Sequence, residues 1–268
     1  MKRTREEEIE HINKIVNLLK SKEAGLIANI NNNELGHIYG LLAGMQFLYA
    51  IHSYFVENDK NKTKDLLNLQ GKYKLKQAQL TKGSRIFEVA RTLISNVAIS
   101  DNLELINTYG NFNYPISYVS RNKTIETDYK SWVANGQECI YSELMLNSMN
   151  KDIDKLKGNL KIFKSKTLKK KMNQRMLMDL EFYENLIAKN KHQIKSSIEK
   201  FLLTKEHNYR NQHDRFPELI SYPAIGYLKI AKINGFDIKI DNPLIPIDLL
   251  ELSPLKKYSE IITVANKI

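Results

Sequence analysis

Hydrophobic residues recur at helical spacing along most of the chain. In the segment 6–20 they form an amphipathic stripe of Ile9, Ile12, Ile15, Val16 and Leu19. Spacing of three and four residues is typical of a helix that buries one face. Similar stripes predict further helices over residues 58–79, 84–97, 100–109, 124–149, 152–163, 167–189 and 192–203.

This succession of helices predicts a mostly α fold. The expected architecture is a multi-helix bundle, or a stack of antiparallel helical hairpins, with a short extended or irregular C-terminal segment. Residues 110–123 begin with Gly110 and contain Pro115, which predicts a loop or irregular connection. We expect a single helical domain over residues 1–268, with a subdomain seam at 110–123 that separates the helices of 1–110 from those of 124–268.

The C-terminal region from Ser221 to Tyr258 is apolar, yet it holds four of the six prolines. Pro223 suits the first turn of a short helix, because the N–H that proline lacks has no helical partner there. Asn234-Gly235 supplies residue types that accept a left-handed helix cap. The apolar residues of 236–240 then alternate with charged ones, which predicts a half-buried extended segment. It is the only part of the chain that resembles a strand.

This arrangement resembles the C-terminal part of the immunity protein 49 family, in which a short helix ends at a glycine before an apolar, proline-punctuated tail. The paired helices from Asp179 to Leu202 and the helix containing Trp132 are also similar to that family. The resemblance implies a bacterial immunity protein of a polymorphic toxin system. Such a protein binds and occludes the C-terminal domain of a cognate toxin, acting as a toxin inhibitor through protein–protein interaction. It implies neither an enzyme nor a cofactor.

The segment from Leu35 to Val56 contains no Lys, Arg, Asp or Glu and is long enough to cross a bilayer. Gly36, Gly40 and Gly44 lie four residues apart, a spacing that lets helices approach closely. Polar side chains, among them His37 and His52, would be costly in lipid. We therefore predict a buried helix with its glycine stripe against a neighbour, and a membrane span is the alternative. The basic start lacks an apolar signal region, so we expect a cytoplasmic protein without a membrane partner.

Positive charge is concentrated in one segment of the chain. The formal net charge is +11, and the residues from Lys155 to Met178 include nine basic side chains and no acidic one. Such a segment attracts an acidic protein surface or a polyanion, although a solvated helix face explains it equally. Phe163 is its one aromatic residue and Arg175 its one arginine, which argues against nucleic acid as the partner. The predicted contact residues here are Lys161, Lys164, Lys169, Lys170, Lys171 and Arg175.

A second polar cluster, from Glu206 to Arg215, predicts either a binding loop or a polar connection between helices. Its candidate contacts to a partner are His207, Tyr209, Arg210, His213 and Arg215. The two histidines are six residues apart, unlike the pair of a helical zinc site, and we predict no metal. We also find no phosphate-binding loop and no nucleophile elbow.

Two further expectations concern the core and the runner-up function. The single cysteine, Cys139, excludes an intramolecular disulfide and suggests a buried hydrophobe, and Trp132 is expected in the core. The alternative to an immunity protein is a helical nucleic-acid-binding or regulatory protein that uses the segment Lys155–Arg175.

Overall fold

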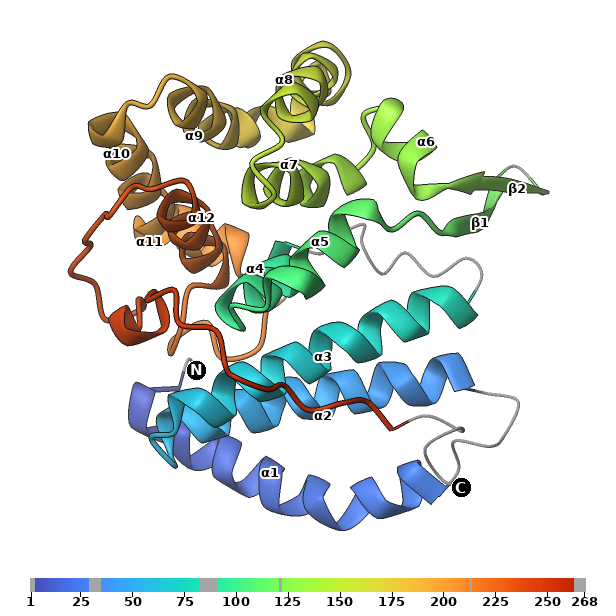
Figure 1. Cartoon of the computed structure of the whole chain (residues 1–268), viewed down its shortest axis with the longest axis vertical. Coiled ribbons are helices and arrows are strands. Elements are labelled where there is room, and N and C mark those ends of the chain that lie inside the picture. Colours follow the sequence, from blue (N-terminus) through green and yellow to red (C-terminus); the bar gives the residue numbers. More distant parts are fainter. Residues whose placement is uncertain (1–2, 29–34, 82–90, 121, 213, 263–268) are drawn as a thin grey trace.

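Helices dominate the computed structural model, which describes residues 3–28, 35–81, 91–120, 122–212 and 214–262. Helices α1–α3 lie on one side of the molecule, α8–α10 on the opposite side, and α4, α5 and α12 between them (Figure 1). The predicted mostly α fold is confirmed. The helices in chain order are α1 (Arg5–Ala28), α2 (Leu35–Phe55), α3 (Lys60–Leu80), α4 (Arg91–Ile99), α5 (Leu103–Asn111), α6 (Tyr129–Ala134), α7 (Cys139–Met149), α8 (Ile153–Ile162), α9 (Leu177–Ile187), α10 (Lys191–Leu202), α11 (Thr204–Arg210) and α12 (Tyr222–Ile233).

Several predicted helix starts are confirmed by their capping side chains. Asp59 accepts a hydrogen bond from the Lys62 N–H at 2.9 Å, and Asp152 accepts one from the Lys155 N–H at 3.1 Å. These bonds satisfy N–H groups that have no partner within the helix. Asn102 caps α5 in the same way, slightly later than predicted. Of the helix predicted over 84–97, the part up to residue 90 lies outside the described residues.

Helix α2 is largely buried and packs along α3 and α1. A Cβ atom at Gly36 would lie 1.9 Å from Thr81 Oγ1, and one at Gly40 would lie 2.5 Å from Gln77 Nε2. Both glycines therefore permit the close approach of the two helices, as predicted. The prediction is wrong for Gly44, which is exposed and has nothing near its Cβ position. Across the described helices, none has both the length and the apolar character that crossing a membrane requires.

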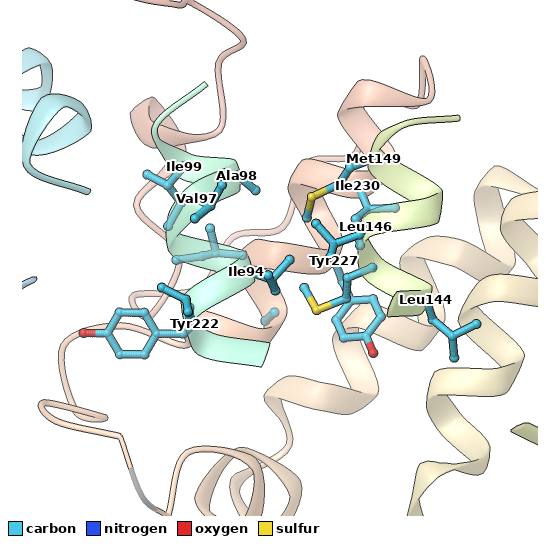
Figure 2. Packing of buried hydrophobic residues seen from close by; sticks show 14 of the residues in the cluster. Ile94, Val97, Ala98, Ile99, Leu144, Leu146, Met149, Tyr222, Tyr227 and Ile230 are labelled. Atoms are coloured by element: carbon cyan, nitrogen blue, oxygen red, sulfur yellow. The ribbon is translucent and has the colours of Figure 1, made fainter. Parts of the chain in front are cut away.

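The main core forms where α4, α7 and α12 meet (Figure 2). Ile94 and Val97 of α4 lie near Leu146 of α7 and Ile230 of α12, and all four are buried. Helix α4 comes from the N-terminal part of the chain and the other two from the C-terminal part, so one core joins both. Cys139 and Trp132 are buried as predicted.

Residues 115–120 and 123–128 form a pair of strands where the sequence predicted a loop and the start of a helix. Strand β1 (Pro115–Ser120) pairs antiparallel with β2 (Lys123–Asp128), from Pro115 opposite Asp128 to Ser120 opposite Lys123. The helix predicted over 124–149 is therefore wrong in its first part. Asp128 instead caps α6, accepting from the Ser131 N–H at 2.9 Å. The chain then turns at Gly136, whose φ of +66° separates α6 from α7.

The helix predicted over 167–189 is also shorter than expected. A wide π turn, η2 (Phe163–Thr167), ends where that helix was predicted to begin. A 3-10 turn, η3 (Lys171–Met176), follows, and α9 begins only at Leu177. Side-chain bonds stabilise these turns, because Asn173 Nδ2 donates to the Thr167 carbonyl at 3.0 Å and Gln174 donates to the Leu168 carbonyl. Amides that bond to local backbone groups favour turns over a regular helix.

The end of α12 follows the prediction closely. Pro223 lies in its first turn, and Gly235 has a φ of +87°. The Phe236 N–H donates to the Ala231 carbonyl at 2.9 Å and the Gly235 N–H donates to Lys232 at 3.0 Å, which is the Schellman pattern. Residues 236–240 are extended, but the prediction of a strand is wrong, since no strand pairs with them in the described part of the chain.

The C-terminal tail is fixed across the fold by a buried ionic cluster. Asp101 accepts from Lys64 Nζ at 2.6 Å and from Lys229 Nζ at 2.5 Å. Both lysines also donate to the Glu251 carbonyl, at 3.3 Å and 3.1 Å. Burial lowers the pKa of Lys229 to about 8, although Asp101 opposes that shift. The cluster thus joins α3, α12 and the tail around one carboxylate.

Candidate partner-binding surface

The basic segment lies on a continuous stretch made of α8, η2, the following turn and the start of η3. Its lysine side chains are all exposed. We call them the lysine surface, which consists of Lys155, Lys157, Lys161, Lys164, Lys166, Lys169, Lys170 and Lys171. Arg175, near the end of η3, is half-buried.

Apolar contacts and one glycine hold the backbone of the lysine surface in place. Phe163 is fully buried, and its ring meets the Tyr141 ring edge-on at 5.6 Å. Thr167 Oγ1 donates to the Gly136 carbonyl at 2.9 Å. A Cβ atom at Gly136 would lie 2.6 Å from the Lys166 Cβ, so the close contact and the positive φ both require glycine there. The backbone is anchored to the core while the lysines face outward.

Half of the lysine surface has a bonding partner within the chain. Lys155 pairs with Asp152 at 2.8 Å, Lys164 pairs with Glu184, and Lys166 Nζ donates to the Ala134 carbonyl at 2.7 Å. Lys170 Nζ donates to the Gln137 side chain at 3.5 Å. Over the described residues, no ion pair or hydrogen bond engages the side chains of Lys157, Lys161, Lys169 and Lys171. The surface therefore retains positive charge that an external acidic group can approach.

Arg210, in the second predicted segment, has a different environment. Residues 204–210 form helix α11, and the Arg210 side chain is 0% exposed. Its two terminal nitrogens bond both oxygens of Asp179, at 3.1 Å and 2.9 Å, and its guanidinium lies 4.2 Å from the centre of the Phe201 ring. Tyr227 also donates to Asp179. Arg210 therefore holds α11 to α9 and α10, and Tyr227 joins α12 to the same carboxylate.

The electrostatics of this pair follow from burial and attraction. Burial alone would raise the pKa of Asp179, but the Arg210 guanidinium outweighs it and holds the pKa of that carboxyl below its ordinary value. Burial would likewise lower the pKa of Arg210, yet Asp179 raises it. Both groups are consequently charged, and each neutralises the other inside the protein.

His207 is also buried and bonded within the fold. Its Nε2 donates to the Pro217 carbonyl at 3.0 Å, and its Nδ1 accepts from the Asn211 amide at 3.1 Å. The expectation of an exposed loop that presents His207 and Arg210 is therefore wrong, because both side chains have partners inside the fold. Arg215 is exposed, and His213 lies outside the described residues.

The two predicted segments meet at Arg175 and Tyr209. The Arg175 guanidinium lies 4.4 Å from the centre of the Tyr209 ring, and its Nε lies 3.9 Å from a Glu206 oxygen. Both side chains are half-buried, so part of each faces solvent. The structure thus brings together one residue of the predicted basic segment, Arg175, and one of the predicted polar cluster, Tyr209, where η3 meets α11.

Sequence reasoning missed Asp179. A signal was present, since Asp179 is the first acidic residue after the lysine segment and stands among Leu177, Met178 and Leu180. A carboxylate among apolar residues of a helix indicates a buried charge that needs a partner. No group of three or more His, Cys, Asp or Glu side chains that could hold a metal ion occurs in the described ranges.

Residues 130–249 match the family model described as Immunity protein 49. The match confirms the resemblance of the C-terminal half of the chain to this family. It runs from α6 to the short helix η4 (Ile247–Leu249), and therefore includes the lysine surface and α11. No curated protein and no solved structure matches the chain.

Proposed function

We propose that this chain is an immunity protein that binds a bacterial toxin domain encoded beside it and blocks that toxin by occlusion. A helical surface would cover the active site or the substrate groove of the toxin, one immunity protein to one toxin domain. The family match supports the class of function, and it includes the helices that carry the lysine surface. The protection would take place in the cytoplasm of the producing cell.

The lysine surface is the observation that carries the partner chemistry. It is exposed, and four of its lysines have no partner in the chain as described. An acidic toxin surface would gain long-range attraction from these charges, and the encounter of the two proteins would be faster. The toxin surface that is covered should therefore be acidic, or should include a groove lined with carboxylates.

Arg175 and Tyr209, which stack on each other, and the exposed Arg215 supply anchors of a different kind. Arginine and tyrosine are the residue types that contribute most to binding energy in protein interfaces. The stacking of Arg175 on Tyr209 holds both side chains before a partner arrives, which reduces the entropy lost on binding. We propose that the lysines speed association and that these three residues slow dissociation.

Co-expression with the neighbouring toxin domain tests the proposal. Cells that carry the toxin domain and this chain should grow, and the two proteins should purify as a one-to-one complex. The triple variant Lys169→Glu, Lys170→Glu, Lys171→Glu should remain folded and protect cells less well.

A matched control separates the surface from total charge. Lys20, Lys22 and Lys60 are also exposed and lie outside the matched region, so changing all three to Glu alters the net charge equally. This control variant should protect as well as the unchanged protein. Equal loss of protection in both triple variants would argue against a specific role for the lysine surface. Failure of the unchanged protein to bind or protect would overturn the proposed function itself.

A further inference from the structure

The extended segment after α12, residues 237–241, leaves its backbone unpaired. Figure 1 shows the chain after α12 running along the edge of the molecule. No backbone N–H or C=O group of residues 237–241 has a hydrogen-bond partner in the described structure. The backbone is hydrogen-bonded again on both sides of this segment. The Phe236 N–H closes the cap of α12, and the Ile245 N–H donates to the Asn242 carbonyl at 2.9 Å. The segment is thus a stretch of non-helical backbone, outside any sheet, whose N–H and C=O groups are free to pair.

Two grooves adjoin this segment, and both are lined by Asp237, Ile238 and Lys239. The first groove has a volume of about 380 Å³ and is mainly apolar. Its apolar lining comes from Leu228, Phe236, Ile238, Ile240, Ile247 and Leu250. The second has a volume of about 550 Å³ and is bounded by Lys191, His192 and Lys195 of α10.

The second groove keeps a positive charge. Asp237, its one acidic residue, is already paired with Lys232 at 2.7 Å, and this bond lowers the pKa of Asp237. Lys195 lies 3.7 Å from Glu199. Neither Lys191 nor Lys239 forms an ion pair with a residue that the structure describes. An acidic side chain would therefore complement this groove.

We propose that residues 237–241 bind an extended strand of a protein partner by β-augmentation. The added strand would satisfy the open N–H and C=O groups, as strands do when they join a free sheet edge. Its successive side chains point to opposite faces, so apolar residues would enter one groove and acidic residues the other. A helix or a small amphiphile would fill a groove but would leave the backbone unpaired. This inference does not depend on the proposed function.

Selection of peptides on the full-length protein tests the proposal. A phage-displayed library of random 12-residue peptides should yield sequences in which β-branched or aromatic residues alternate with Glu or Asp. The best sequence would then be synthesised in two forms, with its odd or its even backbone amides N-methylated. Only one edge of an added strand bonds to the protein, so one form should bind at least about tenfold more weakly and the other should bind nearly as the parent does. Equal weakening in both forms, or in neither, would overturn the proposal.

Two variants locate the binding site. Ile247 lines the apolar groove and is 57% exposed, so Ile247→Asp should weaken binding of the selected peptide at least about fivefold without disturbing the core. Lys191→Glu should weaken it further for peptides with acidic residues. Leu203 is 60% exposed and lies outside both grooves, which makes Leu203→Asp the matched control with unchanged binding. Full binding by a folded Ile247→Asp, Lys191→Glu protein would show that the peptides bind elsewhere.

Discussion

The lysine surface and helix α11 look alike in sequence but have opposite environments. Both segments are polar and rich in basic residues, and both were predicted to contact a partner. The lysines at 155–171 are exposed, whereas Arg210 and His207 of α11 are buried and bonded within the fold. A basic side chain can therefore belong either to a binding surface or to a structural contact, and its residue type alone does not show which.

The number of acidic groups within reach accounts for the difference. No acidic residue occurs from Lys155 to Met178, so the lysines must rely on the few carboxylates that other helices offer. Helix α11 carries its own Glu206 and faces Asp179 across the core. A buried guanidinium needs a carboxylate, because an unpaired charge in the interior is very costly. Excess charge therefore remains at the surface, where it is available to a partner.

The largest expected effect is loss of the buried pair. Arg210→Ala removes the bidentate partner of Asp179 and leaves the buried carboxylate with Tyr227 and, 3.9 Å away, Arg91. We expect the free energy of unfolding to fall by about 3–5 kcal/mol, measured by denaturant titration. The control is Arg215→Ala, an exposed arginine of the same predicted segment, which should change stability by less than about 0.5 kcal/mol. Similar small losses in both variants would mean that Arg210 is not the structural residue described above.

The stability that the buried pair of Asp179 and Arg210 contributes should also depend on pH in the acid range. The pKa of Asp179 is lower in the folded protein than its ordinary value of 3.8, so the unfolded chain binds a proton first as the pH falls. The stability from this group is therefore present above pH 3.8 and is lost as the pH falls through the folded pKa.

A paired replacement isolates this contribution. The double variant Asp179→Leu, Arg210→Met lacks the Asp179 carboxyl, so its stability should decline less steeply below about pH 4 than that of the unchanged protein. Denaturant titrations at successive pH values from about 5 to 3 would measure the two slopes. Parallel slopes would contradict the assigned pKa direction.

A smaller effect is expected where the two segments meet. The contact between Arg175 and Tyr209 is half-exposed, and such cation–π pairs contribute about 0.5–1 kcal/mol. A double-mutant cycle with Arg175→Ala and Tyr209→Leu would measure the coupling in the free energy of unfolding. Strictly additive effects would show that the two side chains do not stabilise each other in solution.

The smallest effect on stability should come from the lysine surface. The triple variant Lys169→Glu, Lys170→Glu, Lys171→Glu should unfold within about 0.5 kcal/mol of the unchanged protein, because exposed charges contribute little to folding. Thermal and denaturant unfolding would measure this. A large loss of stability would assign these lysines to the fold and would remove the contrast with Arg210.

Local signals in the sequence predicted much of the fold. The helices predicted over 58–79 and 152–163 begin at the caps Asp59 and Asp152, and Pro223 and Gly235 bound α12 as expected. Each of these residues acts on backbone groups only a few positions away, so the local sequence is sufficient to predict its role. The pair of strands was missed because residues 124–128 were assigned to the start of the helix predicted over 124–149, and only the pairing of β1 with β2 excludes that helix start.

The candidate site was harder to predict for a related reason. Lys169 is exposed because no acidic residue lies near it in the sequence to neutralise its charge, and the absence of Asp and Glu from Lys155 to Met178 can be read from the sequence directly. The burial of Arg210 depends on Asp179, which is 31 residues away in the chain. Contacts over such separations depend on how the helices pack, and periodicity does not record that packing.

The association rate with the toxin domain, measured at several salt concentrations, tests the central claim most directly. That claim is that the lysine surface guides an acidic toxin to this protein. The unchanged protein should associate quickly at low ionic strength and more slowly as salt screens the charges. The triple variant at Lys169–Lys171 should associate at least about tenfold more slowly at low salt and should depend less on salt. A folded triple variant with the unchanged rate and the unchanged salt dependence would contradict the account.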